Sequence, residues 1–251
     1  WYGGGLKKDF KKASEIQKKT SINFAKLLDI VAKSFPKFRI RFTTSNPQDM
    51  DNEVLITMKA HKNICNHIHL PVQSGSDKIL KEMNRQHTRK EYLNLVTEIK
   101  TILPNCGISQ DMITGFPNET EKDHLDTLSL MKLVKYDFGF MFKYSERPGT
   151  LASRKLDDNI PEEIKQRRLS EIIDLQFKHS FENLSKYVNK KTVVLIEKES
   201  KKSKGYWAGR NEQNIMVVFP KEDFKTGDFV EVLVQENTAT TLKGLGLNRI
   251  I

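Results

Sequence analysis

The feature that most constrains the fold is a regular alternation of helix and strand patterns over residues 21–144. Apolar residues at helical spacing separate four apolar runs typical of strands, namely "FRIRF", "HIHLPV", "CGISQDMITGF" and "DFGFMFKYS". Ser76 is a candidate N-cap, and Thr88 with Glu91 forms a candidate capping box. Four strands joined by helical crossovers predict an α/β fold with a parallel sheet, either open or barrel-like.

Small and polar residues follow each of the four predicted strands. The four strand ends read "TTSNP", "QSGS", "TGFPNET" and "YSERPGT". In parallel α/β folds ligands bind at the carboxyl ends of the strands, where loops vary without disturbing the core. The same residue types also make ordinary turns. One such loop would favour a simple turn, but four at equivalent positions make a ligand site an equally good interpretation.

The charge balance favours a polyanionic partner. The chain has a formal net charge of +10 and a pI near 9.4, although many basic proteins bind no nucleic acid. No apolar run approaches the ~20 residues that span a bilayer, and no signal-peptide pattern opens the sequence. The two cysteines form no CxxC pair or disulfide framework. We therefore expect a cytoplasmic protein that binds no membrane.

Residues 188–251 change from helical periodicity to alternation. After a predicted linking helix over residues 159–187, five short strands indicate a small antiparallel β-barrel. Basic residues gather at one predicted hairpin, beside Tyr206 and Trp207. They are Lys198, Lys201, Lys202, Lys204 and Arg210. Such a mixture suits a phosphate backbone with an unstacked base, and a solvated charged loop is the alternative.

Three motifs, in this order, resemble the radical S-adenosylmethionine (SAM) methylthiotransferases, and more narrowly the tRNA adenosine methylthiotransferases of the MiaB type. They are "HIHLPVQSGSDKILKEMNRQHTRKEYL", "DMITGFPNETEKDHLDTL" and "FMFKYSERPGT". The resemblance covers about residues 1–250. It implies that residues 21–158 form part of a TIM-type (β/α) barrel, with the third to sixth strands present, and that residues 188–251 form an RNA-binding TRAM domain. The glycine-rich, basic residues 1–20, which begin with Trp1, suggest that a longer chain has been cut.

The resemblance implies roles for several residues at the strand ends. Those facing S-adenosylmethionine would be Thr43, Ser45, Gln73, Ser74, Ser76, Asp111 and Ile113. Gly75 would let the backbone approach the cofactor, whereas plain helix capping is the alternative role for Ser76. Asp111 stands where the generic motif has glycine, which puts its contact in doubt. Lys143, Tyr144 and Arg147 are candidate contacts to the substrate.

One departure from the family concerns its iron–sulfur clusters. The resemblance implies a CxxxCxxC loop that holds a [4Fe–4S] cluster, and a second cluster domain, but this chain has neither cysteine set. Cys65 and Cys106 are too far apart in the sequence to replace them. His67 and His69 would point to one face of a strand, yet with no carboxylate expected nearby we favour packing over a metal site. The chain by itself is therefore expected to be catalytically inert, with no metal ligands.

The activity implied for the parent protein is methylthiolation of C2 of N6-isopentenyladenosine beside the anticodon. Its partner would be the anticodon stem-loop of a tRNA, and we expect a monomer. Two alternatives within the family are methylthiolation of threonylcarbamoyladenosine or of an aspartate on a ribosomal protein. A third alternative, of another class, is a non-catalytic RNA-binding protein.

Overall fold

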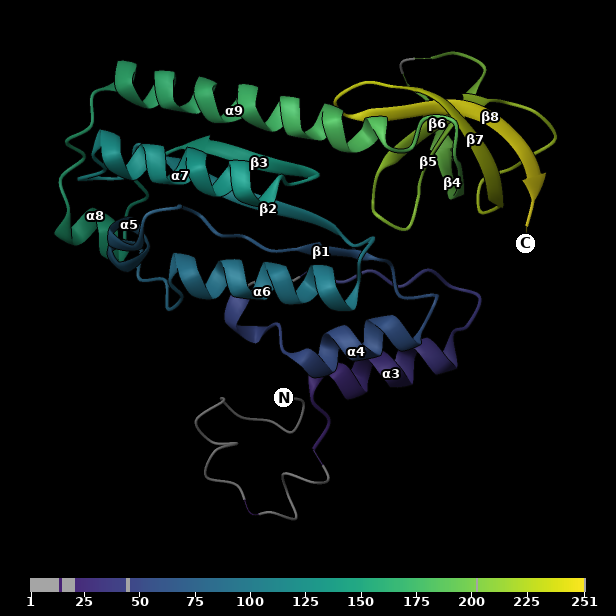
Figure 1. The fold of residues 1–251 in the computed structure, drawn as a ribbon, viewed down its shortest axis with the longest axis horizontal. Coiled ribbons are helices and arrows are strands. Elements are labelled where there is room, and N and C mark those ends of the chain that lie inside the picture. The colour runs from purple at the N-terminus through teal and green to yellow at the C-terminus, as the bar shows by residue number, and fades with distance from the viewer. Residues whose placement is uncertain (1–13, 15–20, 44–45, 202, 251) are drawn as a thin grey trace.

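The computed structural model describes residue 14 and residues 21–43, 46–201 and 203–250. It has two lobes joined by one long helix (Figure 1). The first lobe contains a three-stranded parallel sheet in the order β1 (His67–His69), β2 (Gly107–Thr114), β3 (Phe138–Lys143). The second lobe is a closed barrel in the order β4-β5-β6-β8-β7. Its strands are β4 (Lys191–Glu199), β5 (Tyr206–Arg210), β6 (Met216–Pro220), β7 (Phe229–Asn237) and β8 (Thr241–Arg249).

Helices separate the strands of the first lobe and cover one face of the sheet (Figure 1). Those of the crossovers are α3 (Phe24–Ser34), η1 (Pro47–Asp49), α4 (Asn52–Ala60), α5 (Asp77–Glu82), α6 (Arg89–Ile102) and α7 (Glu121–Val134). The short α8 (Leu151–Lys155) precedes α9 (Glu162–Ser185), which packs on β3 and α7 and runs to the barrel. No helix among the described residues combines the length and apolarity needed to cross a membrane.

The predicted helix starts are confirmed by their hydrogen bonds. The Ser76 side chain accepts from the backbone N–H of Ile79, which caps α5. Thr88 and Glu91 form the reciprocal capping box that begins α6. Thr120 and Asp123 form a second one at the start of α7. These side chains occupy backbone N–H groups that a helix leaves without intrahelical partners, so the local sequence fixes where each helix begins.

The strand predicted at Phe38–Phe42 does not form. This segment contributes only a single parallel bridge, between Ile40 and Ile64, and Phe38 is 67% exposed. The physical reason lies in its arginines, which bond to the second lobe. Arg39 donates to the carbonyl oxygens of Arg210 and Val193, and Arg41 donates to that of Asn211 at 2.6 Å. The prediction of four strands is therefore wrong by one.

The main core lies between the sheet and its helices. Ile68, Ile108 and Met112 are fully or almost fully buried on the helix-covered face of the sheet. The hydroxyl of the buried Tyr92 on α6 donates to the carbonyl of Leu70 at 2.9 Å, which ties that helix to the end of β1. Apolar burial of this kind contributes about 25 cal/mol per Å², so it supplies most of the stabilisation of this lobe.

The barrel has its own core, as its alternating sequence predicts. Val194, Val217, Val232 and Phe219 are completely buried within it. Its strand pairs are antiparallel except β6 and β8, which run parallel. The prediction of an entirely antiparallel barrel is therefore wrong at that pair, because β7 lies between β6 and β8 in the sequence but outside them in the barrel.

A buried ion pair anchors α9 to the loop that follows β2. Arg168 Nη1 donates to Glu119 Oε2 at 2.8 Å, and their side chains are only 5% and 1% exposed. The same carboxylate oxygen accepts from the backbone N–H of Gly115 at 2.7 Å. Gly115 has a φ of +71°, and a Cβ there would lie 2.3 Å from Cγ of Lys165 on α9. The loop and the helix therefore fit each other closely.

Replacing Arg168 by alanine should lower the free energy of unfolding by about 3–5 kcal/mol, because it leaves the buried Glu119 carboxylate without its partner. The neighbouring Arg167 provides a matched control. It is 42% exposed and pairs with Glu121 and Glu171 on the surface, so Arg167→Ala should change the free energy of unfolding far less than Arg168→Ala. Urea unfolding of both variants measures the difference. Equal, small losses would show that the buried pair is not the anchor.

Candidate functional site

The face of the sheet opposite the helices carries polar and aromatic side chains. The strands pair in register, so His69, Ser109 and Phe138 lie side by side, as do Asp111 and Phe140. Alternation along each strand then puts a larger set on this face. Its members are His67, His69, Ser109, Asp111, Ile113, Phe138, Phe140 and Phe142. Phe140 and Phe142 are each 54% exposed, so the face is partly open to solvent.

Hydrogen bonds join four of these side chains into a chain. Ser109 Oγ lies 3.0 Å from His67 Nε2 and 2.9 Å from His69 Nδ1, and His69 Nε2 lies 3.4 Å from Asp111 Oδ2. A carboxylate only accepts hydrogen bonds, so His69 Nε2–H donates to Asp111 and His69 Nδ1 is left to accept from the Ser109 hydroxyl. His67 Nε2–H then donates to Ser109. The chain of hydrogen bonds therefore runs from His67 to Asp111.

The histidine pair corrects one expectation. His67 and His69 do share a face, but a carboxylate, Asp111, lies beside His69 where none was expected. Even so, no group of three His, Cys, Asp or Glu side chains that could hold a metal ion occurs within the described part of the chain. Burial, together with the nearby positive charge of Arg41, lowers the pKa of His67 to about 3. His67 is therefore neutral at pH 7 and stacks on Phe138, with ring centroids 5.3 Å apart.

Gln73 forms an isolated bridge to β2 beyond the end of β1. Its N–H donates to the carbonyl of Asp111 at 2.9 Å, and its carbonyl accepts from Ile113 at 3.0 Å. Between the pairs His69–Ser109 and Gln73–Met112, the Gln73 segment has one residue more than β2. Gln73 also has a φ of +73°, a conformation that is uncommon outside glycine. Irregular backbone of this kind is frequent beside functional sites, where it re-aims side chains.

Arg85 lies near Asp111 and was missed by the sequence interpretation. Burial lowers the pKa of Arg85, and the negative charge of Asp111 opposes that effect. Arg85 follows Asn84, which has a φ of +57°, and its N–H closes the end of α5 on the carbonyl of Leu80 at 2.8 Å. Asn commonly ends helices in this conformation, so Asn84 in "KEMNRQ" is the sequence signal that could have placed Arg85 just after α5. Among the described residues, the amide of Gln73 makes no hydrogen bond, so it is available to a ligand together with Asp111 and Arg85.

The "QSGS" turn is attached to α7. Ser74 is completely buried and lies 3.4 Å from the Thr127 hydroxyl, which also accepts from the Gly75 N–H at 2.9 Å. Ser76 donates to Asp123 at 2.6 Å. A Cβ on Gly75 would lie 2.5 Å from Cα of Thr127, so the close approach of Gly75 is to the backbone of α7. The polar groups of Ser74 and Ser76 are therefore already occupied within the protein.

The other predicted contacts lie elsewhere. Thr43 is exposed and follows no strand, and Ser45 lies outside the described residues. Lys143 pairs in register with Thr114, on the helix-covered side of the sheet, and forms an ion pair with Glu162 of α9. Tyr144 packs its ring edge-on against Phe116, and Arg147 is exposed in the following turn. The structure therefore groups Gln73, Asp111 and Ile113 but separates Lys143 from them.

The predicted RNA-binding hairpin joins β4 and β5. Lys198, Lys201 and Lys204 are exposed there, whereas Lys202 lies outside the described residues. Trp207 packs partly into the barrel core, and Lys221 Nζ lies 4.7 Å above its ring. Arg210 donates to the carbonyl of Asn214 at 3.1 Å and lies 3.6 Å from the Glu197 carboxylate. The exposed lysines are thus open to solvent, whereas Trp207 and Arg210 already have partners in the barrel.

Two family profiles match the chain, and they match its two lobes. The Radical SAM superfamily matches residues 8–131, and the TRAM domain matches residues 185–245. The chain therefore contains a radical SAM domain. Its barrel is a TRAM domain, as the sequence predicted. The boundaries proposed from the sequence at residues 20, 158 and 187 stay predictions.

Several proteins similar to this chain share one name. It is 64% identical over 97% of its length to a protein of Christiangramia forsetii named tRNA-2-methylthio-N(6)-dimethylallyladenosine synthase, and 61% identical over 97% to one of Flavobacterium psychrophilum with the same name. It covers 51% of each, so the chain spans about half the length of these relatives. A solved structure of coproporphyrinogen III oxidase (HemN) from Escherichia coli shares the fold, with a TM-score of 0.53 and 17% identity over 90% of this chain and 57% of that one.

The described residues of the radical SAM lobe do not fit an iron–sulfur cluster. Cys65 and Cys106 are both buried and free. Burial raises the pKa of Cys65, and raises that of Cys106 to about 12, so both stay protonated at neutral pH, whereas cluster ligands are thiolates. In contrast, Gln73, Arg85 and Asp111 offer an amide, a cation and a carboxylate at one sheet edge. That set fits a zwitterionic amino-acid group or ribose hydroxyls.

Replacing Gly75 by alanine should destabilise the radical SAM lobe by about 1–3 kcal/mol without any ligand, because the added Cβ overlaps the backbone of α7. Urea unfolding measures this loss. Lys81→Ala on the exposed side of the adjacent α5 is the control and should change stability by less than about 0.5 kcal/mol. A fully stable Gly75→Ala variant would show that α7 does not require glycine here.

His67 should make stability fall as the pH drops below neutral. An unfolded histidine takes up a proton near its ordinary pKa of about 6.5. The folded chain does so only near the His67 pKa of about 3. The unfolded state therefore binds more protons between these values, and stability falls as the pH decreases through this window.

Urea unfolding at pH 6.5 and pH 5 tests this dependence. His67→Phe should remove about 2 kcal/mol of the decline. Between pH 7.5 and pH 8.5 both states hold a neutral imidazole, so variant and parent should show the same slope there. An identical decline in both proteins at acid pH would contradict the assignment of His67 as a buried, neutral side chain.

Proposed function

We propose that this chain is the cofactor-holding and RNA-binding part of a tRNA methylthiotransferase that acts on C2 of N6-isopentenyladenosine. The observation that carries the proposal is that Gln73, Arg85 and Asp111 lie near one another in a radical SAM lobe, with the Gln73 amide free of hydrogen bonds to the described residues and only one Asp111 oxygen bonded, to His69. The relatives of this chain named tRNA-2-methylthio-N(6)-dimethylallyladenosine synthase support the reaction and the substrate. The anticodon stem-loop, a monomeric state and a cytoplasmic location belong to the same proposal.

The residues at the sheet edge take separate roles toward S-adenosylmethionine. The Asp111 carboxylate accepts from an ammonium or ribose hydroxyl group, and His69 holds one of its oxygens by a hydrogen bond. The Arg85 guanidinium pairs with a carboxylate, and the Gln73 amide both donates and accepts. Ile113, half-exposed on the same face, provides an apolar contact for the adenine ring. When bound, S-adenosylmethionine supplies the methyl group and the source of the radical.

The TRAM barrel takes the role of RNA binding. Lys198, Lys201 and Lys204 project from its hairpin without burial and suit phosphate groups. The names of the relatives favour isopentenyladenosine over threonylcarbamoyladenosine or a ribosomal-protein aspartate. They also favour an enzyme over a non-catalytic RNA-binding protein. Because the described residues hold no cluster ligands, none of these roles includes a step through a cluster.

A chimeric enzyme tests the proposed function. Here the chain replaces the matching half of the Christiangramia forsetii synthase, and the chimera is expressed in a bacterial strain that lacks the methylthio modification. We expect 2-methylthio-N6-isopentenyladenosine in the tRNA hydrolysate by mass spectrometry. A soluble chimera that leaves the tRNA unmodified, while the intact synthase restores the modification, would overturn the proposal.

The cofactor residues are tested in the same chimera by equilibrium dialysis with labelled S-adenosylmethionine. Asp111→Asn removes a charged acceptor and should weaken binding roughly tenfold to a hundredfold, equivalent to about 1.5–3 kcal/mol. Gln73→Ala removes neutral hydrogen bonds and should cost about 0.5–1.5 kcal/mol. Asp174→Asn, on the exposed surface of α9, is the matched control and should leave binding unchanged. Unchanged affinity in both site variants would remove these residues from the site.

A further inference from the structure

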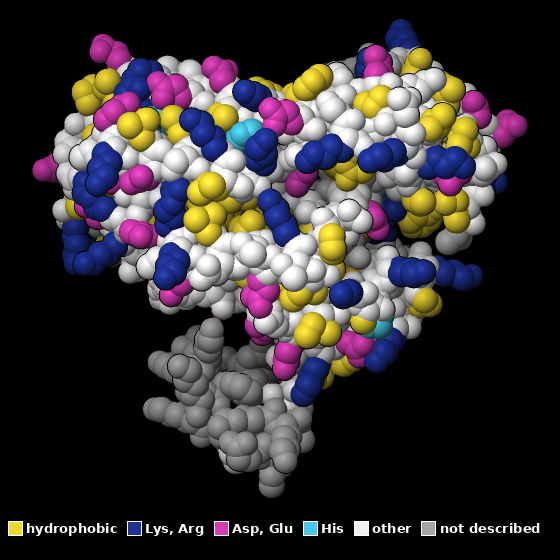
Figure 2. Space-filling model, viewed as in Figure 1, with side chains coloured by type: hydrophobic (Ala, Val, Ile, Leu, Met, Phe, Trp, Pro, Cys, Tyr) yellow, Lys and Arg dark blue, Asp and Glu magenta, His cyan; other side chains and the backbone are white. Residues whose placement is uncertain are grey.

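A cavity of about 740 Å³ lies where the two lobes meet. Figure 2 shows the surface hollowed between the lobes, with Lys and Arg side chains along the rim. Gly107 and Asp137 line this cavity at the amino ends of β2 and β3. The candidate cofactor residues lie toward the carboxyl ends. Asp111 lies four residues beyond Gly107 on β2, about 13 Å along the strand, and none of the candidate cofactor residues lines the cavity, so the cavity is a separate site.

Six cationic side chains line the cavity, against three carboxylates. The cations are Arg39, Lys100, Lys135, Lys186, Lys190 and Lys191, and the carboxylates are Asp137, Glu212 and Glu231. Three of the cations already interact with other groups of the protein. Arg39 bonds to backbone carbonyls of the barrel and lies 5.1 Å above the Phe229 ring. Lys135 pairs with Glu182 at 3.0 Å, and Lys191 pairs with Glu231 at 2.9 Å.

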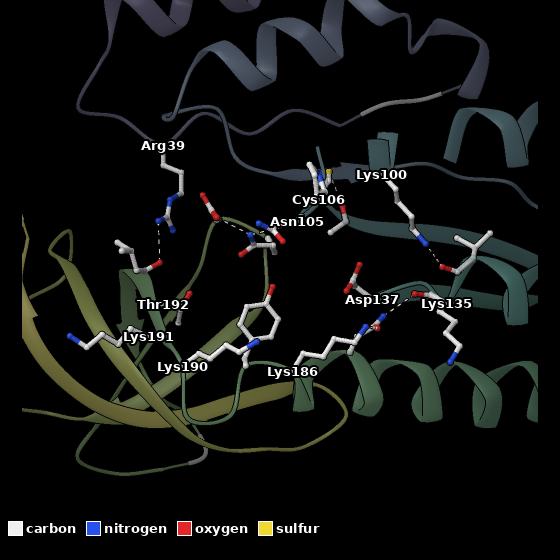
Figure 3. Close-up of a pocket in the computed structure, with 18 of the residues that line it drawn as sticks. Arg39, Lys100, Asn105, Cys106, Lys135, Asp137, Lys186, Lys190, Lys191 and Thr192 are labelled. Carbon is white, nitrogen blue, oxygen red and sulfur yellow. Dashed lines mark hydrogen bonds between the residues drawn. The ribbon is translucent and has the colours of Figure 1, made fainter. Parts of the chain in front are cut away.

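The other three lysines have no acidic partner within the described part of the chain. Lys100 Nζ donates to the carbonyl of Val134 at 2.8 Å, and Lys186 Nζ donates to the side-chain oxygen of Asn183 at 2.7 Å. The side chain of Lys190 forms no hydrogen bond or ion pair with the described residues. In Figure 3, Lys100 enters from one side of the cavity, and Lys186 and Lys190 enter from the opposite side. The cavity is therefore bordered by three lysines that form no ion pair with the described residues.

The remaining carboxylates only partly offset this charge. Asp137 Oδ2 accepts from the backbone N–H of Ile108 at 2.8 Å. Burial raises the pKa of Asp137, and the nearby charges of Lys186 and Lys100 oppose that effect, so Asp137 offsets part of the charge of these two lysines. Glu212 accepts a hydrogen bond from the Gln213 amide at 2.8 Å. Neutral groups from Tyr187, Asn105 and Gln213 complete the lining. A ligand with several negative charges and some hydrogen-bonding groups matches this surface.

We propose that this cavity binds phosphate groups of an RNA strand, through Lys100, Lys186 and Lys190. The lysines come from three chain segments, namely α6, the end of α9 and the connection to β4, so they surround a groove rather than enclose one small anion. The volume far exceeds the ~30 Å³ occupied by one water molecule in the liquid, and leaves room for a sugar–phosphate segment. Lysine ammonium groups act as point charges toward phosphates and carry no base preference.

This inference rests on the proposed function and adds the path of the RNA. The cavity and the candidate cofactor edge lie at opposite ends of the sheet, so one RNA occupies both only if the bound segment is several nucleotides from the modified base. The proposed site in the cavity is also separate from the exposed lysines of the hairpin that joins β4 and β5. It would orient the RNA relative to both lobes, because its lysines come from both sides of their junction.

The test measures binding of this chain to a fluorescent RNA stem-loop as a function of salt. Neutralising each phosphate contributes about 0.7–0.9 to the slope of log K against log salt. The triple variant Lys100→Gln, Lys186→Gln, Lys190→Gln should therefore weaken binding at least roughly tenfold at low salt and flatten the slope by about two to three units. Lys190→Glu, a single change at an exposed side chain without partners, should weaken binding with no change in the unfolding midpoint.

Matched variants separate this site from the others. Lys191→Gln, on the same rim but paired with Glu231, should leave affinity and slope nearly unchanged. Unchanged RNA binding in the triple variant, with loss in Lys201→Gln plus Lys204→Gln, would overturn the cavity site and leave the proposed function intact. An unmodified chain that binds no RNA at all would overturn the RNA partner itself. Displacement of RNA by millimolar pyrophosphate at constant ionic strength would show a site for a compact anion and also overturn the proposal.

Discussion

The buried pair of Arg168 and Glu119 fixes the position of α9 on the first lobe. It joins α9 to the loop after β2, and α9 continues directly to the TRAM barrel. Removing two charges from water is costly, and the pair recovers this cost only through good geometry and further hydrogen bonds. Glu119 has both, since it accepts from Gly115 as well as from Arg168. The interaction therefore selects one position of the helix, and Arg39 and Arg41 fix the barrel from the other side.

The strand-end loops divide their polar groups between structure and ligand binding. Ser74 and Ser76 form hydrogen bonds with side chains of α7, and Glu119 forms hydrogen bonds with Arg168 of α9. Burying such groups is acceptable because each has a partner. The polar groups that can still bind a ligand belong to Gln73, which has a positive φ, to Arg85 at the end of α5, and to Asp111 on the open face of the sheet. The loops thus position the site, while few of their own side chains are free to form it.

The barrel docks at the end of the sheet opposite the candidate cofactor edge. Gln213 of the barrel donates to the carbonyl of Asn105 just before β2, and a Cβ on Gly107 would lie 3.0 Å from the carbonyl oxygen of Gln213. This placement puts the basic junction at the amino ends of the strands, away from the candidate cofactor residues. An elongated, charged partner such as RNA can use both ends, whereas a small molecule occupies only one.

The sequence by itself determined the order of elements, the helix starts and the two-lobe organisation, because periodicity and capping act over a few residues. Thr88 with Glu91, and the alternation after residue 188, needed no distant partner to be interpreted. Only the tertiary structure decided the rest. Phe38–Phe42 alternates like a strand but forms no strand, because Arg39 and Arg41 hydrogen-bond to residues about 170 positions away. Likewise, Asp111 reached His69, and Lys100 reached Lys186 and Lys190, through pairing and packing across long sequence separations, which no local pattern encodes.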